Sequence, residues 1–185
     1  MRKILIAVLI LLVAGAAFVV LAPRFLDYHA APVAGALDGD ALVLEGEALK
    51  TPDPSPEQSF RFANNALELT VLPNQPAPTA AERGVRILLT PERAAHINER
   101  AVLVEARYRA AAASGLAVSL QGIGPSEWVA QPLNGGEGVA RFELPAQFAV
   151  DALGLRALSE AGGAVTITQI RISAAPEPAP APAQP

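Results

Sequence analysis

The sequence predicts an all-β fold, a β-sandwich of about eight or nine short strands with one short helix, behind a single transmembrane helix. A long uncharged apolar run occupies most of the first 22 residues. Beyond it, short stretches alternate apolar and polar residues, as strands with one buried face do. Clusters of glycine, proline and asparagine separate these stretches and predict turns. The 185 residues leave room for one domain beyond the run, and not comfortably for two.

The apolar run at residues 4–22 has the length of a membrane span. At a rise of about 1.5 Å per residue it covers roughly 28 Å, close to the hydrocarbon thickness of a bilayer. The run is longer than the apolar core of a secretory signal, and Pro23 disfavours cleavage after Ala22, so we favour an uncleaved signal-anchor over a cleaved signal. Arg2 and Lys3 predict a cytoplasmic N-terminus. The chain is therefore expected to span a bacterial inner membrane once, with its C-terminal domain in the periplasm.

The composition divides the chain into four parts. Residues 1–22 form the predicted anchor, with the lipid bilayer as the partner of its apolar run. Residues 23–41 are rich in alanine, glycine and proline and predict a stalk. Residues 42–173 hold the strands of the sandwich. Residues 174–185 alternate proline and alanine and predict a disordered tail.

Nine stretches of the central part have the pattern of strands. They are residues 42–44, 59–62, 66–72, 85–89, 101–109, 116–121, 140–144, 153–156 and 165–172. The single helix is predicted after Thr90, a residue that commonly precedes a helix, because Pro91 suits the first helical position and Glu92 suits the first turn.

The last of these strands changes phase in its middle. Val165 and Ile167 share one phase, whereas Ile170 and Ile172 have the opposite one. A β-bulge at residues 168–169 would bring all four side chains to one face, and without it the strand would be buried on both sides.

Composition and motifs disfavour several classes of function. Beyond Arg2 and Lys3 there are 12 basic and 18 acidic residues, a formal charge of −6, so a nucleic-acid partner is not expected. The chain has no cysteine, which excludes disulfides, thiolate metal sites and a lipoprotein anchor. The sequence carries none of the common hydrolase, zinc-protease or phosphate-loop motifs. We therefore expect no cofactor, no metal and no enzyme activity.

The second half of the chain resembles the galactose-binding-like jelly-roll sandwich that many carbohydrate-binding modules use. The resemblance rests on V-x-V-x-A-R-Y at 102–108, L-x-V-x-L-Q at 116–121, Trp128, F-x-L-P at 142–145, D-x-L-G-L-R at 151–156 and V-x-I-x-x-I-x-I at 165–172. It implies a jelly-roll-like sandwich. Members often bind a structural calcium through an acid near the position of Gln169, and the glutamine here argues against calcium. Sugar-binding members usually display two or more stacking aromatic rings, and this domain has one tryptophan.

The best candidate binding surface is a set of polar residues out of phase with the core. It comprises Arg107, Arg109, Gln121, Arg141, Glu143 and Arg156, with Trp128 at its rim. We expect these residues on one outer sheet face, either as a groove for a polar ligand or as an ordinary solvated face of charge pairs. Trp128 either lines that groove or folds over the edge of the core.

These observations predict a membrane-anchored, non-catalytic binding or assembly module of the bacterial cell envelope. One alternative is a carbohydrate-binding module for envelope or exported polysaccharide, and another is an enzyme of unrecognised type. The expected partner beyond the bilayer is an envelope protein or a polysaccharide.

Overall fold

The computed structural model describes residues 30–50, 52–71, 73–111 and 114–175. The apolar run at residues 4–22 and most of the predicted tail lie outside this part of the chain. Within it, no helix is both long enough and apolar enough to cross a membrane.

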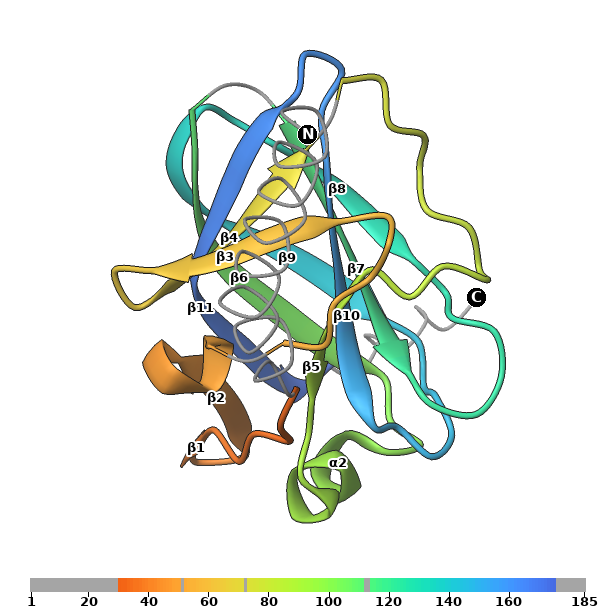
Figure 1. The fold of residues 1–185 in the computed structure, drawn as a ribbon. Coiled ribbons are helices and arrows are strands. Elements are labelled where there is room, and N and C mark those ends of the chain that lie inside the picture. The colour runs from red at the N-terminus through yellow and green to blue at the C-terminus, as the bar shows by residue number, and fades with distance from the viewer. Residues whose placement is uncertain (1–29, 51, 72, 112–113, 176–185) are drawn as a thin grey trace, which may run out of the picture.

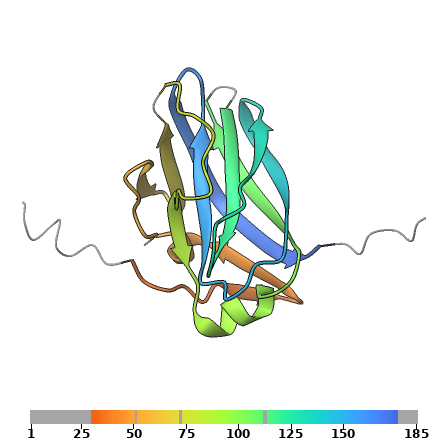
Figure 2. The same ribbon diagram turned by 90° about the vertical axis from the view of Figure 1, so that its right-hand side faces the viewer.

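The described chain forms two antiparallel sheets that lie face to face (Figures 1 and 2). The larger sheet has seven strands: β1 Ala36–Asp38, β2 Ala41–Glu45, β3 Ser59–Ala63, β4 Ala66–Val71, β6 Val102–Ala110, β9 Gly136–Leu144 and β11 Gly163–Ala174. The smaller sheet has four: β5 Val85–Leu88, β7 Ser114–Gln121, β8 Val129–Leu133 and β10 Ala152–Leu158. A 3-10 helix, η1 (Gly46–Leu49), and one α-helix, α2 (Pro91–Ile97), complete the elements. The predicted all-β sandwich is confirmed, with eleven strands instead of eight or nine.

The two additional strands, β1 and β8, lie where the sequence predicted stalk and loop. β1 has three exposed residues, and β8 contains Pro132 and exposes three of its five residues. Both are short strands without a clear apolar phase, so alternation could not reveal them. A second part of the predicted stalk, at Val33, is also hydrogen-bonded to the sandwich. The Val33 N–H donates to Leu88 O (2.7 Å), and the Thr90 N–H donates to Val33 O (3.1 Å).

Strand β11 lies at the centre of the larger sheet. Along one side it pairs with β6, and along the other it pairs with β4 in its first half and β2 in its second. Its register against β6 shifts between Ile167 and Gln169, so the predicted bulge is confirmed. Val165, Ile167, Ile170 and Ile172 are consequently all fully buried.

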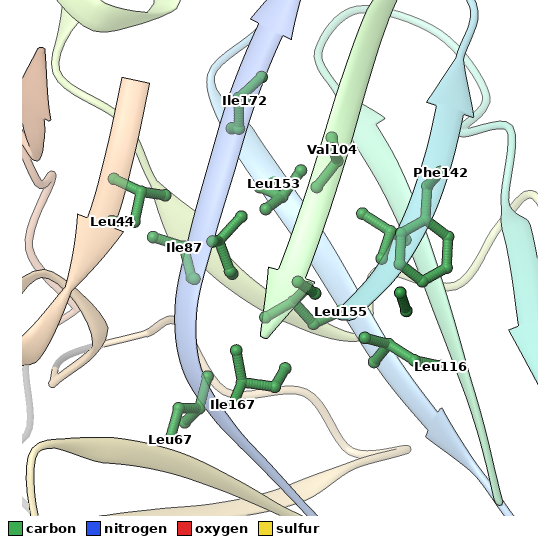
Figure 3. Packing of buried hydrophobic residues seen from close by; sticks show 14 of the residues in the cluster. Leu44, Leu67, Ile87, Val104, Leu116, Phe142, Leu153, Leu155, Ile167 and Ile172 are labelled. Atoms are coloured by element: carbon green, nitrogen blue, oxygen red, sulfur yellow. The ribbon is translucent and has the colours of Figure 1, made fainter. Parts of the chain in front are cut away.

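Apolar side chains from both sheets fill the space between them. Figure 3 shows Val104, Phe142 and Ile172 of the larger sheet together with Leu116, Leu153 and Leu155 of the smaller one. Each of these six side chains is at most 1 % exposed.

Helix α2 closes one end of the sandwich (Figure 1) and begins where the sequence predicted. Ala94 and Ile97 bury its inner face. Thr90 precedes it in extended backbone, but the Thr90 hydroxyl does not cap the helix. A hydrogen bond with its own backbone N–H lowers the pKa of Glu92, which favours the charged form in the first turn.

The central strands of the smaller sheet, β7 and β10, are buried on both faces, so the expectation of one buried face per sheet is wrong for them. Six of the seven residues of β10 are buried. Its outward positions carry small residues such as Ala152 and Gly154, and the neighbouring outward position of β7 is Ser119, which is also fully buried. Small side chains let other segments lie close to this face. Loops 52–58 and 73–84 are hydrogen-bonded to it through Arg156 and Gln121.

Candidate functional site

The structure divides the seven predicted site residues between the two sheets. Arg107 and Arg109 lie in β6, and Arg141 and Glu143 lie in β9 of the larger sheet. Gln121 lies in β7 and Arg156 in β10, and Trp128 precedes β8 of the smaller sheet. The expectation that they share one outer sheet face is therefore wrong, because sequence phase does not tell which sheet a strand joins.

The outer face of β6 and β9 carries exposed charge pairs. Arg141 Nε donates to Glu105 Oε1 at 2.8 Å, and Arg109 Nε donates to Glu137 Oε1 at 2.8 Å. Each pair joins residues directly opposite in the ladder, and both arginines are about two-thirds exposed or more. Exposed pairs of this kind contribute about 0–1 kcal/mol each. This part of the predicted surface has the features of a solvated sheet face.

Arg141 and Glu143 also line a shallow groove at the sandwich edge between β9 and β8. The groove has a volume of about 430 Å³ and is bounded by Leu103, Glu105, Val129 and Gln131 in addition. Neither Arg107 nor Arg109 lines it. In the described part of the chain, the side chains of Arg107 and Glu143 form no hydrogen bond or ion pair.

Arg156 is buried, with 3 % of its side chain exposed. Its Nη1 donates to the Glu57 carbonyl oxygen at 2.8 Å, and its Nη2 lies 3.4 Å from Glu82 Oε2. Glu57 and Glu82 belong to the two loops that cover the smaller sheet. Arg156 therefore holds both loops on the sheet and is not accessible to a ligand.

Trp128 is half-buried against the chain at Gly84. A Cβ built on Gly84 would lie 2.8 Å from Trp128 Cη2 and 2.5 Å from the Leu155 carbonyl oxygen. Gly84 has φ +57°, so both its backbone and the space around it favour glycine. The ring is therefore folded onto the outside of the smaller sheet. Its indole N–H is buried and forms no hydrogen bond within the described residues.

The remaining predicted residue, Gln121, lines a polar cavity that we call the end cavity. It has a volume of about 590 Å³. It lies at the end of the smaller sheet at which β5 and β7 end and β10 begins. We call this end of the sandwich the α2 end. Its lining is formed by residues 80–83 and 124–126 together with Arg86, Gln121, Gly122 and Asp151. Gln121 Nε2 donates to Arg83 O at 2.6 Å and to Ser119 Oγ at 3.2 Å. The end cavity is thus bounded by two loops and rests on the sheet.

Arg86 and Asp151 form an ion pair in the end cavity, which Glu82 and Arg83 also line. Arg86 Nη1 donates to Asp53 Oδ2 at 3.2 Å, and Arg86 Nη2 donates to Asp151 Oδ1 at 2.9 Å. The Arg86 side chain is 14 % exposed and that of Asp151 is 63 % exposed. A fixed donor and a fixed acceptor therefore lie side by side at an accessible position. This pair was not predicted, because in the sequence each residue is only a polar position in a strand pattern.

The described residues contain no cluster of three or more His, Asp or Glu side chains suited to a metal ion. The arrangement around Arg86 offers hydrogen-bond donors and acceptors to a neutral polar ligand.

Comparison with known proteins gave no matching family model and no matching curated protein. Several solved structures are similar in fold. The module CBM1 of BiXyn10A in its apo form is 10% identical and has a TM-score of 0.46, covering 67% of this chain and 88% of that one. The carbohydrate-binding module CBM6cm-2 of Cellvibrio mixtus lichenase 5A, in complex with cellotriose, is 14% identical with a TM-score of 0.40, covering 72% and 96%.

The CBM22-1 xylan-binding domain of Paenibacillus barcinonensis Xyn10C is 13% identical with a TM-score of 0.43, covering 77% of this chain and 97% of that one. This likeness concerns the fold alone. The chain resembles carbohydrate-binding modules in its β-sandwich, as its strand motifs predicted.

Proposed function

We propose that this chain is a non-catalytic binding module that holds part of a saccharide in the end cavity. We further propose that residues 4–22 anchor it in a bacterial inner membrane, with the sandwich in the periplasm as part of the cell envelope. The observation that carries the binding proposal is the Arg86–Asp151 pair at the accessible end cavity.

The chemistry of this pair suits hydroxyl groups. An arginine only donates hydrogen bonds and an ionised aspartate only accepts them, whereas each sugar hydroxyl does both. Two neighbouring hydroxyls can therefore donate to Asp151 and accept from the guanidinium edge of Arg86. A volume of about 590 Å³ is in the range of small-molecule pockets, roughly 300–1,000 Å³. The size and polarity support a short saccharide segment.

The binding proposal is tested with the full-length chain in nanodiscs on an array that includes cellotriose and xylan fragments. We expect Asp151→Asn to weaken binding at least tenfold, since hydrogen bonds to charged groups contribute about 1.5–3 kcal/mol. Asp38→Asn is the matched control, because Asp38 is similarly exposed and pairs with Arg171 on the other sheet. It should leave binding unchanged.

Absence of glycan binding above background would exclude the saccharide. Binding that is insensitive to Asp151→Asn but lost in Glu143→Gln would move the site to the groove between β8 and β9. An envelope protein as partner is the competing proposal, and repeated recovery of one protein by cross-linking in intact envelopes, without glycan binding, would favour it.

The anchoring proposal is tested separately. Full-length protein should remain with membranes after alkaline carbonate extraction, and protease added to spheroplasts should digest the sandwich. Release by carbonate would exclude the anchor without bearing on saccharide binding.

A further inference from the structure

Two large apolar side chains are exposed on neighbouring connections at the α2 end. Ile123 is 71% exposed and Phe148 is 59% exposed. They come from the β7–β8 and β9–β10 connections, and the Ile123 N–H donates to the Phe148 carbonyl oxygen at 3.2 Å. We call this pair the apolar tip. The other large apolar residues exposed in the described part of the chain, Leu37 and Val139, lie on strands β1 and β9.

The backbone holds the apolar tip in place. A Cβ on Gly122 would lie 2.4 Å from Ala149 O and 2.5 Å from Phe148 O, so the two connections are in close contact. Ala149 has φ +51°, an unfavourable conformation for a residue with a side chain. The Val150 N–H donates to Asn98 Oδ1 at 3.2 Å, which fixes the second connection to the end of α2. The exposure of Phe148 is therefore built into a packed loop.

The N-terminal part of the chain enters the fold at the same end. Val33 forms backbone hydrogen bonds with Leu88 and Thr90. The Leu89 N–H donates to the Asp151 carbonyl oxygen, and the Asp151 N–H donates to the Gln121 carbonyl oxygen. This row crosses the end of the smaller sheet in three steps of about 4.8 Å each. Ile123 lies two residues after Gln121, the last residue of this row of hydrogen bonds.

The length of the intervening chain limits how far this end can be from a membrane. Ten residues separate Ala22 from Val33. Fully extended, they reach about 35 Å, so an anchor at residues 4–22 keeps the α2 end at the bilayer surface or within that distance.

We propose that the apolar tip, Ile123 and Phe148, inserts into the surface of the bilayer that holds the anchor. This inference rests on the proposed anchoring. Phenylalanine is typical of the buried face of membrane-surface segments, and isoleucine has an apolar side chain as large as that of leucine, which is also typical there. Two side chains alone bind a membrane weakly, but a tether raises the effective concentration of lipid around them to the millimolar range or above. The contact places the end cavity next to the lipid headgroups, because Gly122 and Gly124 on either side of Ile123 line it.

The test uses the full-length chain in vesicles that contain doxyl-labelled phosphatidylcholine. The chain has no cysteine, so a single introduced cysteine can carry a fluorophore without background labelling. Ala146→Cys places the probe in the β9–β10 connection, next to the apolar tip, and Ala161→Cys places it in the turn after β10. At about 3.3 Å per residue, the length of β10 puts the two ends roughly 20 Å apart.

We expect at least twofold stronger quenching at position 146 than at position 161. The double substitution Ile123→Ser and Phe148→Ser should reduce quenching at 146 to the value at 161. Val139→Ser, which removes an exposed apolar side chain on β9, should leave it unchanged. If the double variant fails to fold, the single substitutions Ile123→Ser and Phe148→Ser decide, because each should lower quenching at 146 whereas the tether alone would leave it unchanged.

Equal quenching at 146 and 161 in vesicles that retain the chain after carbonate extraction would overturn the lipid contact while the anchor stands. Release of the chain by carbonate would remove the anchor and the contact together. Energy transfer between probes at 146 on different molecules, without lipid quenching, would show that a second copy covers the apolar tip and would overturn the proposal.

Discussion

Arginines in the same sequence pattern end in opposite environments. Arg107 and Arg156 each alternate with core residues, yet the Arg107 side chain is exposed and that of Arg156 is buried under two loops. Alternation correctly predicted that both point away from the space between the sheets. It could not predict which outer face is covered, because that depends on loops 52–58 and 73–84, which reach Arg156 from about 75 to 100 residues away in the chain.

Replacement of Arg156 is expected to be costly. Arg156→Met leaves Glu82 and the Glu57 carbonyl oxygen buried without their partner, and removal of one member of a buried pair costs about 3–5 kcal/mol. The free energy of unfolding should fall by about 3 kcal/mol in urea titrations followed by the fluorescence of Trp128. Arg107→Met is the control and should change it by less than about 0.5 kcal/mol. Similar values for the two variants would mean that the loops are not held by Arg156.

At the scale of elements, strands with a strong apolar phase were predictable, and the two short strands without one, β1 and β8, were not. The phase change of β11 in the sequence predicted either a bulge or burial on both faces, and the register shift between Ile167 and Gln169 shows that the bulge is formed. β8 was missed because it has exposed residues at its centre and a proline. Arg86 and Asp151 were missed as a pair for a related reason: their contact depends on the pairing of β5 with β10, and no local pattern specifies that pairing.

Removal of the bulge tests its role directly. Deletion of Thr168 removes the extra residue and leaves Val165, Ile167, Ile170 and Ile172 in strict alternation, so all four can still point to the core. We expect the deletion variant to keep its cooperative thermal unfolding transition in circular dichroism, because β11 retains its buried apolar face without the bulge. Thr168→Ala keeps the residue count and should lower stability by less than about 1 kcal/mol. Loss of the cooperative transition in the deletion variant would show that the bulge itself, and not only the apolar phase of β11, is required for folding.

At the scale of the whole molecule, the features to which we assign proposed functions gather at the α2 end. The end cavity, the apolar tip and the point where the chain enters the fold all lie there, although the residues that form them are spread from Val33 to Asp151. The sequence alone predicted a polar surface across the strands, and the structure shows exposed charge pairs on much of it. The end where the strands terminate was not predictable, because it is formed by loops whose relative positions only the assembled sheets determine.

The central position of β11 has a consequence for when the domain can fold. This strand is the last of the eleven in the chain, yet it pairs with β2, β4 and β6. Until residues 163–174 have emerged from the ribosome, the larger sheet lacks the strand that joins its parts, and these distant pairings slow folding further. The nascent chain should therefore stay open throughout synthesis, in a form that a translocation channel can pass. A chain ending at Gly162 should be digested rapidly by protease, whereas one ending at Ala175 should resist like the full-length protein. Resistance in the shorter chain would show that the first ten strands assemble before the last is made.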